Sequence, residues 1–242
     1  MQFYLVTKKI IYKFLSYFNK RFEYKYRKLA FLQNSHPGRL EWDWKKIHFN
    51  RIALVNLLVS KKDNCSYLEI GCASNSLFDS VPVADKTGVD PKNGGNIRKT
   101  SDDFFTLNNK SFDVIFIDGL HTYEQVHRDV ENSIKCLKAG GWIALHDLLP
   151  RTWEEHHVPM VTNGSWTGDV WKVAFELSKS PGVDFKLLAI DHGVGVFRLT
   201  SPQACLIDLH SELIDKQFGY LYENLQLLPI TSWDAALPWL KS

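Results

Sequence analysis

The chain has 242 residues, of which 45% are apolar and 13% aromatic, so it can bury a sizeable core, and global disorder is excluded. Its net charge of +2 is unevenly distributed. Residues 1–30 contain eight Lys or Arg and one acid, whereas the remaining residues carry about −5. Because the basic charge lies in one terminal segment, the composition does not support a nucleic-acid-binding surface along the chain, and we expect no nucleic-acid partner.

Residues 1–30 predict one amphipathic helix, aromatic on one side and basic on the other. The apolar side contains Phe3, Ile10, Phe14, Tyr17 and Phe18, and the basic residues between them are Lys9, Lys13, Lys20 and Arg21. Two interpretations stay open: the helix packs on the domain or on another subunit, or it makes a peripheral contact with an anionic membrane. The aromatic side also leads us to expect a homo-oligomer.

A second helix is predicted over residues 42–60, after the break at His36-Pro37-Gly38. The predicted organisation is therefore an N-terminal helical extension over 1–60, a main domain over 61–200 and a C-terminal helical tail over 201–242. No stretch approaches the ~20 apolar residues of a membrane-spanning helix. The four cysteines form no zinc-binding pattern, and no secretory signal is recognisable, so we expect reduced thiols and a cytoplasmic protein.

Strand and helix patterns alternate through the main domain. Strands are predicted near 66–70, 86–90, 97–100, 113–118 and 142–147, and helices near 75–80, 102–107, 122–138 and 169–179. Such alternation predicts an α/β fold with a mostly parallel sheet and right-handed crossovers. Residues 184–190 and 194–199 predict a closing antiparallel hairpin, which ordinary dinucleotide dehydrogenases lack.

An acid follows, or ends, several of these strands. Glu69, Asp90, Asp102 and Asp118 each lie where a predicted strand meets a loop or helix. Open α/β sheets bind nucleotide-like ligands at the carboxyl ends of their strands, so these acids are expected at one edge of the sheet.

Six motifs occur in order: Y-L-E-I-G-C-A, T-G-V-D-P, T-S-D-D-F-F, F-D-V-I-F-I-D-G-L-H-T-Y-E-Q-V, L-K-A-G-G-W-I-A-L-H-D and G-D-V-W-K. Together they resemble the small class I S-adenosylmethionine-dependent methyltransferases of bacteria. The group that they resemble most includes relatives of macrolide-sugar O-methyltransferases and cephalosporin-hydroxylase-like proteins. The resemblance covers roughly residues 65–200 and implies a Rossmann-like fold.

The resemblance implies a site for S-adenosylmethionine. Its residues would be Glu69, Gly71, Cys72, Ala73, Asp90, Ser101, Asp102 and Asp118. In this arrangement Glu69 receives the amino group, Asp90 the ribose hydroxyls and Asp102 the adenine amino group, while Gly71 allows close approach of the backbone. Ser74-Asn75-Ser76 stand where many relatives have further glycines, which puts the geometry of this loop in doubt.

The reaction centre is expected between the predicted strands 113–118 and 142–147. His121 is the preferred general base, with Asp147 and His146 as further catalytic residues. In metal-assisted relatives, carboxylates at the positions of Asp118 and Asp147 hold Mg²⁺, which lowers the pKa of an acceptor hydroxyl. A metal-free site stays open, because a histidine at position 146 suits Mg²⁺ less well than a carboxylate.

A long loop over residues 148–168 separates this centre from the next helix, and loops of that length are usually functional. Trp153, His156 and Trp166 are its candidate contacts to a substrate. Asp169, in the G-D-V-W-K motif just after the loop, is a further candidate, and a role at the start of the next helix is the alternative. Aromatic and polar side chains suit a sugar or another polyhydroxylated small molecule, so we expect O-methylation of such an acceptor. The alternatives are a non-catalytic binding or scaffold protein on the same fold and a nicotinamide-dependent oxidoreductase.

Overall fold

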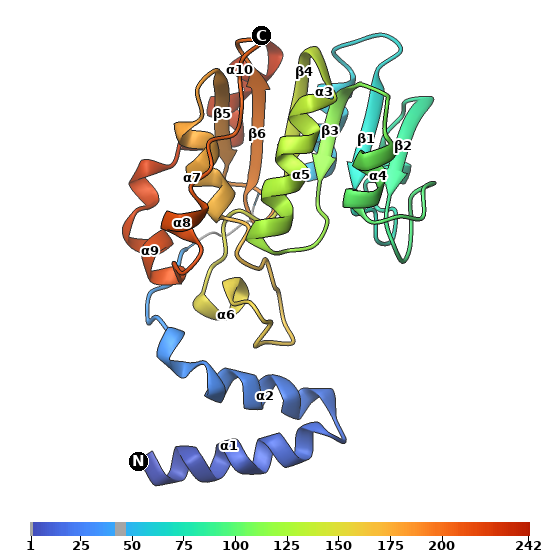
Figure 1. Ribbon diagram of the computed structural model, residues 1–242. Helices are drawn as coiled ribbons and strands as arrows, with labels where there is room; N and C mark the ends of the chain where they lie inside the picture. Colours follow the sequence, from blue (N-terminus) through green and yellow to red (C-terminus); the bar gives the residue numbers. More distant parts are fainter. Residues whose placement is uncertain (1, 42–46) are drawn as a thin grey trace.

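The computed structural model describes residues 2–41 and 47–242, and its centre is a seven-stranded sheet. The strand order is β2-β1-β3-β4-β6-β5-β7 (Figure 1). Only the pairings that involve β6 are antiparallel, and β2, β1, β3 and β4 run parallel. The strands are β1 Ser66–Ile70, β2 Asp85–Val89, β3 Phe112–Ile117, β4 Leu137–Leu145, β5 Val183–Leu188, β6 Val194–Leu199 and β7 Ile230–Thr231. The predicted mostly parallel sheet with a closing hairpin is confirmed.

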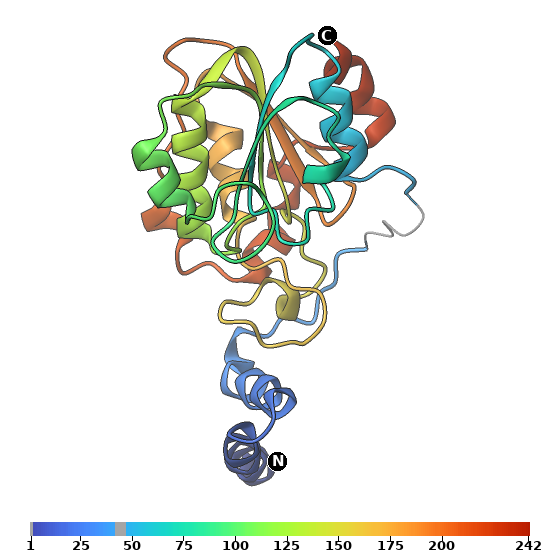
Figure 2. The same ribbon diagram turned by 90° about the vertical axis from the view of Figure 1, so that its right-hand side faces the viewer.

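Helices cover both faces of the sheet (Figure 2). Side chains alternate between the faces along each strand: in β3, Ile115 and Ile117 belong to one buried cluster, whereas Val114 and Phe116 belong to the other. The first cluster includes α5 (Tyr123–Lys135) and α7 (Lys172–Lys179), and the second includes α3 (Arg51–Val59) and α10 (Trp233–Lys241). Both faces are buried, which explains the apolar runs V-I-F-I in β3 and W-I-A-L in β4.

The remaining helices are short and lie near the ends of the sheet. They are α4 Ser101–Leu107, α6 Trp153–His156, α8 His210–Leu213, α9 Phe218–Glu223, and the 3-10 turns η1 Leu32–Asn34, η3 Phe78–Ser80 and η4 Leu225–Leu227. The strand predicted over 97–100 is wrong: Ile97 forms only an isolated bridge with Val89. The chain turns just before this bridge, at Gly94 and Gly95, which both adopt a positive φ that glycine accommodates without strain.

The N-terminal segment is a helical hairpin, so the single helix predicted over 1–30 is wrong. Helix α1 runs over Gln2–Ser16 and α2 over Lys20–Ala30, and the two pack side by side (Figure 1). The break has a local cause: Asn19 is extended and its side chain accepts the Arg21 backbone N–H, which caps α2.

The second helix begins later than predicted. Helix α3 starts at Arg51, because the Asn50 side chain accepts the backbone N–H groups of Ile52 and Ala53. Residues 47–50 are not helical, and the predicted start over 42–46 lies outside the described residues. The buried residues Leu54 and Leu58 place α3 against the sheet, where it packs on β3.

Candidate active site

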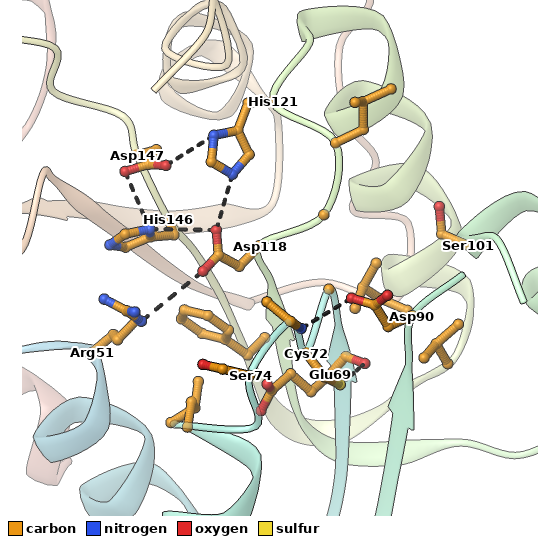
Figure 3. Close-up of a pocket in the computed structure, with 18 of the residues that line it drawn as sticks. Arg51, Glu69, Cys72, Ser74, Asp90, Ser101, Asp118, His121, His146 and Asp147 are labelled. Carbon is orange, nitrogen blue, oxygen red and sulfur yellow. Dashed lines mark hydrogen bonds and ion pairs between the residues drawn. The ribbon is translucent and has the colours of Figure 1, made fainter. Parts of the chain in front are cut away.

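A cavity of about 720 Å³ opens at the carboxyl ends of β1, β2, β3 and β4. Four acids from the ends of these strands line it: Glu69, Asp90, Asp118 and Asp147 (Figure 3). The other predicted site residues in its wall are Gly71, Cys72, Ala73, Ser101, His121, His146 and Trp166. The parallel arrangement therefore brings most of the predicted residues together, although their roles stay predictions.

The end of β1 is buried and tightly packed. Glu69 is 2% exposed, and its carboxylate accepts a 2.6 Å hydrogen bond from the Tyr67 hydroxyl. Burial raises the pKa of Glu69 to about 7, with the nearby Asp118 adding to it, while the bonds from Tyr67 and Cys72 and the charge of Arg51 oppose the rise. The carboxylate that a cationic ligand would bind is therefore easily protonated near neutral pH.

Gly71 lies where the chain after β1 touches the chain after β3, and the space between them leaves no room for a side chain. Its φ is +86°, and a Cβ placed there would lie 2.1 Å from the carbonyl oxygen of Asp118. The expected purpose of this glycine was close approach to a ligand. The immediate constraint is instead the backbone of the β3 end, which this contact helps to hold in place.

Asp90 organises the loops around the cavity. Its carboxylate accepts backbone N–H groups from Ala73, Lys92 and Asn93 at 3.0, 2.7 and 2.8 Å. Burial raises the pKa of Asp90, but these bonds lower it by more, so the group is ionised. A carboxylate has about four acceptor positions, so about one is left for a ribose hydroxyl rather than the two expected.

Asp102 does not face the cavity, which corrects its expected contact with adenine. Its side chain is 51% exposed and lies 3.0 Å from Gln125 Nε2 and 3.4 Å from Arg128 Nε. The adjacent Ser101 does line the cavity, and its Oγ accepts a bond from the same Gln125 amide at 3.1 Å. The polar groups available at this end are therefore Ser101 and Gln125.

Beside these groups, two carboxylates and two imidazoles meet at the ends of β3 and β4 (Figure 3). His121 Nε2 lies 3.4 Å from Asp118 Oδ1, and His121 Nδ1 lies 3.2 Å from Asp147 Oδ2 and 3.2 Å from the Trp166 carbonyl oxygen. His146 Nδ1 lies 3.4 Å from Asp118 and 3.2 Å from Asp147. Residues from two different strand ends thus form one charged cluster.

The neighbouring carboxylates favour the charged form of both imidazoles. Burial lowers the pKa of His146, but the charges of Asp147 and Asp118 raise it well above its ordinary value. The same two carboxylates raise the pKa of His121 by more than burial lowers it. In turn, His146 and His121 hold the pKa of Asp118 well below its ordinary range, against the effect of burial.

The sequence patterns missed Arg51 and Asp191, which complete this cluster. Arg51 Nη1 lies 2.7 Å from Asp191 Oδ2, and its Nε lies 4.0 Å from Asp118 Oδ2. Asp191 Oδ1 is 3.6 Å from His146 Nε2. The D-H-G turn of the predicted hairpin was the available signal for Asp191 and its neighbour His192, which also lines the cavity.

The backbone is strained where it meets the cavity. Ala73, Asp147, Asp191 and His192 all line it and have φ of +43°, +67°, +40° and +63°. Left-handed conformations at residues other than glycine are unfavourable and persist when surrounding contacts impose them, most often at functional sites. This observation supports a functional role for the cavity independently of its charges.

The donor set of the cluster fits a divalent cation. Asp118, His121 and Asp147 each offer one ligand atom, and these atoms lie within 4.8 Å of one another. Among the described residues, both buried ring nitrogens of His146 also lack a partner in hydrogen-bond geometry, although carboxylates lie near them. Two carboxylates and one imidazole can bind Mg²⁺ or Mn²⁺, with Arg51 as the competing cation beside Asp118.

The loop over 148–168 contributes one of its predicted aromatic residues. The Trp166 ring stacks on His121 with centroids 5.4 Å apart and lines the cavity. Trp153 and His156 are 6% and 1% exposed and lie outside the cavity wall. His156 contacts the Trp171 indole, and burial lowers its pKa to about 3. The predicted substrate contacts of Trp153 and His156 are therefore wrong.

Asp169 also lies outside the cavity wall, which favours its alternative role at a helix start over a contact with a substrate. Its carboxylate accepts the Tyr123 backbone N–H at 2.8 Å and pairs with Lys172 at 2.8 Å. An acid at this position satisfies a free N–H at the start of α5 and is favoured by the helix dipole. Asp169 thus fixes the helix that follows His121.

The strand order and the closing antiparallel hairpin are those of the class I methyltransferase fold. Residues 83–148 match a family described as a methyltransferase domain. This segment, about a quarter of the chain, contains Asp90, Asp118, His121 and Asp147 but ends before the loop that carries Trp166. The match confirms the predicted resemblance for that segment. No curated protein matches the sequence.

Solved structures with similar folds include two methyltransferases with bound SAH and one further cofactor-bound protein. The SAH-bound methyltransferase PaMTH1 of Podospora anserina is 18% identical, with a TM-score of 0.46 over 74% of this chain and 96% of that chain. Cofactor-bound Rv0187 from MTB is 13% identical, with a TM-score of 0.48 over 66% and 85%. The SAH-bound O-methyltransferase from Bacillus cereus is 11% identical, with a TM-score of 0.46 over 81% and 99%.

The contact at Gly71 can be tested by substitution. We expect Gly71→Ala to lower the free energy of unfolding by roughly 1–3 kcal/mol more than Gly140→Ala, because the added methyl group overlaps the Asp118 backbone. Gly140 is the matched control: its φ is +73°, and a Cβ there meets nothing within 4 Å. Urea denaturation of both variants measures the difference, and equal losses would show that φ alone makes Gly71 necessary.

Proposed function

We propose that this protein transfers a methyl group from S-adenosylmethionine to a hydroxyl group of a polyhydroxylated small molecule, such as a sugar or glycan. The observation that carries the proposal is the single cavity lined by the strand-end carboxylates of Glu69, Asp90, Asp118 and Asp147. S-adenosylmethionine carries a sulfonium and an amino group but no phosphate. Carboxylates suit it better than the glycine-rich loop and helix N-terminus that bind phosphates.

The half of the cavity at β1 and β2 supports the cofactor assignment. Glu69 offers a buried carboxylate for a cationic group, and Asp90 offers an acceptor position for a ribose hydroxyl. Ser101 and Gln125 add a hydroxyl and an amide in the same wall. The mixed lining matches a nucleoside, whose base is flat and largely apolar and whose ribose is polar.

The other half supports a role in methyl transfer to oxygen. In this mechanism the hydroxyl oxygen attacks the methyl carbon, the carbon–sulfur bond breaks with its electron pair left on sulfur, and the hydroxyl proton passes to His121. A neutral His121 can donate Nδ1–H to the Trp166 carbonyl, which leaves Nε2 to accept that proton. Asp118 and Asp147 then stabilise the resulting imidazolium.

Because the carboxylates raise the pKa of His121, the base function requires positive charge near them when the acceptor binds. A divalent cation held by Asp118 and Asp147 would supply that charge and lower the pKa of the acceptor hydroxyl. Without it, the cationic sulfonium, the Arg51 guanidinium and a protonated His146 are sources of positive charge there. The stacked ring of Trp166 offers an apolar surface for a sugar face at the same place.

Calorimetric titration with S-adenosylmethionine and S-adenosylhomocysteine tests the cofactor assignment. We expect binding in the micromolar range, weakened roughly 10- to 100-fold by Asp90→Asn, which removes the charge of a bonded acceptor. Asp85→Asn is the matched control and should bind as the unmodified chain does, since Asp85 lies half exposed at the other end of β2 and outside the cavity wall. Absence of binding to either nucleoside would overturn the proposal.

Binding should also depend on pH through Glu69. Its pKa of about 7 is raised from the ordinary value, so the carboxylate gains protons as pH falls below 7. A cationic ligand binds the ionised form, and affinity should fall by up to roughly tenfold per unit below that pKa. Glu69→Gln should bind more weakly and lose this part of the dependence between about pH 8 and 5. An identical pH profile in both proteins would contradict a contact between Glu69 and the ligand's cationic group.

The reaction centre can be separated from cofactor binding. We expect His121→Ala to lower turnover on an accepted sugar by roughly 10²- to 10⁴-fold, while its affinity for S-adenosylhomocysteine changes little. His210→Ala is the control, because this histidine is half exposed and lies outside the cavity wall. Release of S-adenosylhomocysteine, with Mg²⁺ and again with a chelator, is the measurement. Full turnover by His121→Ala would place the base elsewhere.

A further inference from the structure

The hairpin of α1 and α2 projects beyond the end of the molecule at which the parallel strands terminate (Figures 1 and 2). Contacts with the loop over 148–168 tie α2 to the rest of the chain: Arg27 Nη1 donates to the Met160 carbonyl oxygen at 3.3 Å, and Lys28 Nζ pairs with Glu154 at 2.7 Å. Helix α1 lies on the far side of α2 (Figure 1). One side of α1 therefore faces away from the protein.

That outer side is apolar. Val6, Ile10 and Phe14 follow one another at intervals of four residues, so they line up along α1, and they are 52%, 64% and 63% exposed. Tyr12 belongs to the opposite side and packs on Phe22 of α2, with ring centroids 5.9 Å apart. The interhelix contact thus uses one side of α1 and leaves a row of large apolar side chains in water. Tyr17 and Phe18 extend this exposed surface at the end of α1, at 77% and 76%.

The charge around this row is strongly positive. Lys9 and Lys13 flank it, and residues 1–30 together carry eight basic residues against the single acid Glu23. A separate cavity, of about 530 Å³, lies on the other side of α2, between that helix and the loop over 148–168. Its basic lining residues are Arg21, Lys25, Lys28, Arg39 and Arg151, against the two acids Glu154 and Glu155. An occupant of this surface must therefore be both apolar and anionic.

We propose that the α1–α2 hairpin binds the surface of an anionic lipid bilayer. Val6, Ile10 and Phe14 would insert at the level of the lipid headgroups, and the lysines beside them would reach the anionic phosphates. Among the described residues, no helix is long and apolar enough to cross a membrane, so the contact is with one leaflet. A second copy of the chain fits less well, since pairing two such hairpins would bring their like charges together.

Flotation of the full-length chain with vesicles tests this proposal. We expect binding at low salt to vesicles of phosphatidylcholine mixed with phosphatidylglycerol, and much weaker binding to phosphatidylcholine alone or at high salt. Ile10→Ser/Phe14→Ser should lower the affinity roughly tenfold or more, because it removes two inserting side chains. Lys9→Gln/Lys13→Gln should lower it roughly fivefold for each charge removed.

Leu107→Ser/Leu227→Ser is the matched control, because these leucines are 69% and 54% exposed but lie outside the hairpin. This variant should bind vesicles as the unmodified chain does, and circular dichroism should show equal helix content in all variants. Failure of the unmodified chain to bind anionic vesicles at low salt would overturn the proposal. Vesicle binding by Ile10→Ser/Phe14→Ser equal to that of the unmodified chain would overturn it too. A third contrary result is that the unmodified chain forms a dimer, that Ile10→Ser/Phe14→Ser dissociates it, and that neither protein floats with vesicles.

Discussion

The end of the sheet that carries the cavity depends on the compensation of charge. Asp118, Asp147 and Asp191 converge there, and like charges this close repel one another strongly in a partly buried site. Arg51, His121 and His146 lie among them and balance that repulsion. The cations come from the start of α3 and the ends of β3 and β4, and the acids come from the ends of β3 and β4 and the β5–β6 turn. The same ion pairs therefore hold these four elements together, and a change of charge at one would be felt by the others.

The residues that could be predicted are those with a local pattern. A run of apolar residues followed by an acid identifies Glu69, Asp90 and Asp118, and parallel pairing brings such strand ends to one edge of the sheet. Arg51 and Asp191 have no such pattern, because they meet across 140 residues of sequence. Only the complete fold brings α3 beside the hairpin turn, so no motif in either segment predicts the contact between Arg51 and Asp191.

The errors have a common physical origin. Trp153 and His156 have the composition of a sugar-binding loop, but the same residue types also make a buried core, and packing decides between the two. Asp102 is next to a second acid, Asp103, and both lie in the first turn of α4. The position at which α4 begins therefore decides the direction in which each side chain points. The helix predicted over 1–30 is interrupted at a single capping residue, Asn19. One such residue is a weaker signal in the sequence than the amphipathic pattern on either side of it.

The loop over 148–168 touches both the hairpin and the cavity. Glu154 and Met160, in its first half and its middle, contact α2, and near its end the Trp166 ring and carbonyl contact His121. Thermodynamic linkage then imposes a reciprocal relation. If a surface bound by the α1–α2 hairpin changes the affinity of the cavity for its ligand by some factor, the ligand must change the affinity of the hairpin for that surface by the same factor. The loop is the segment that contacts both the hairpin and the cavity.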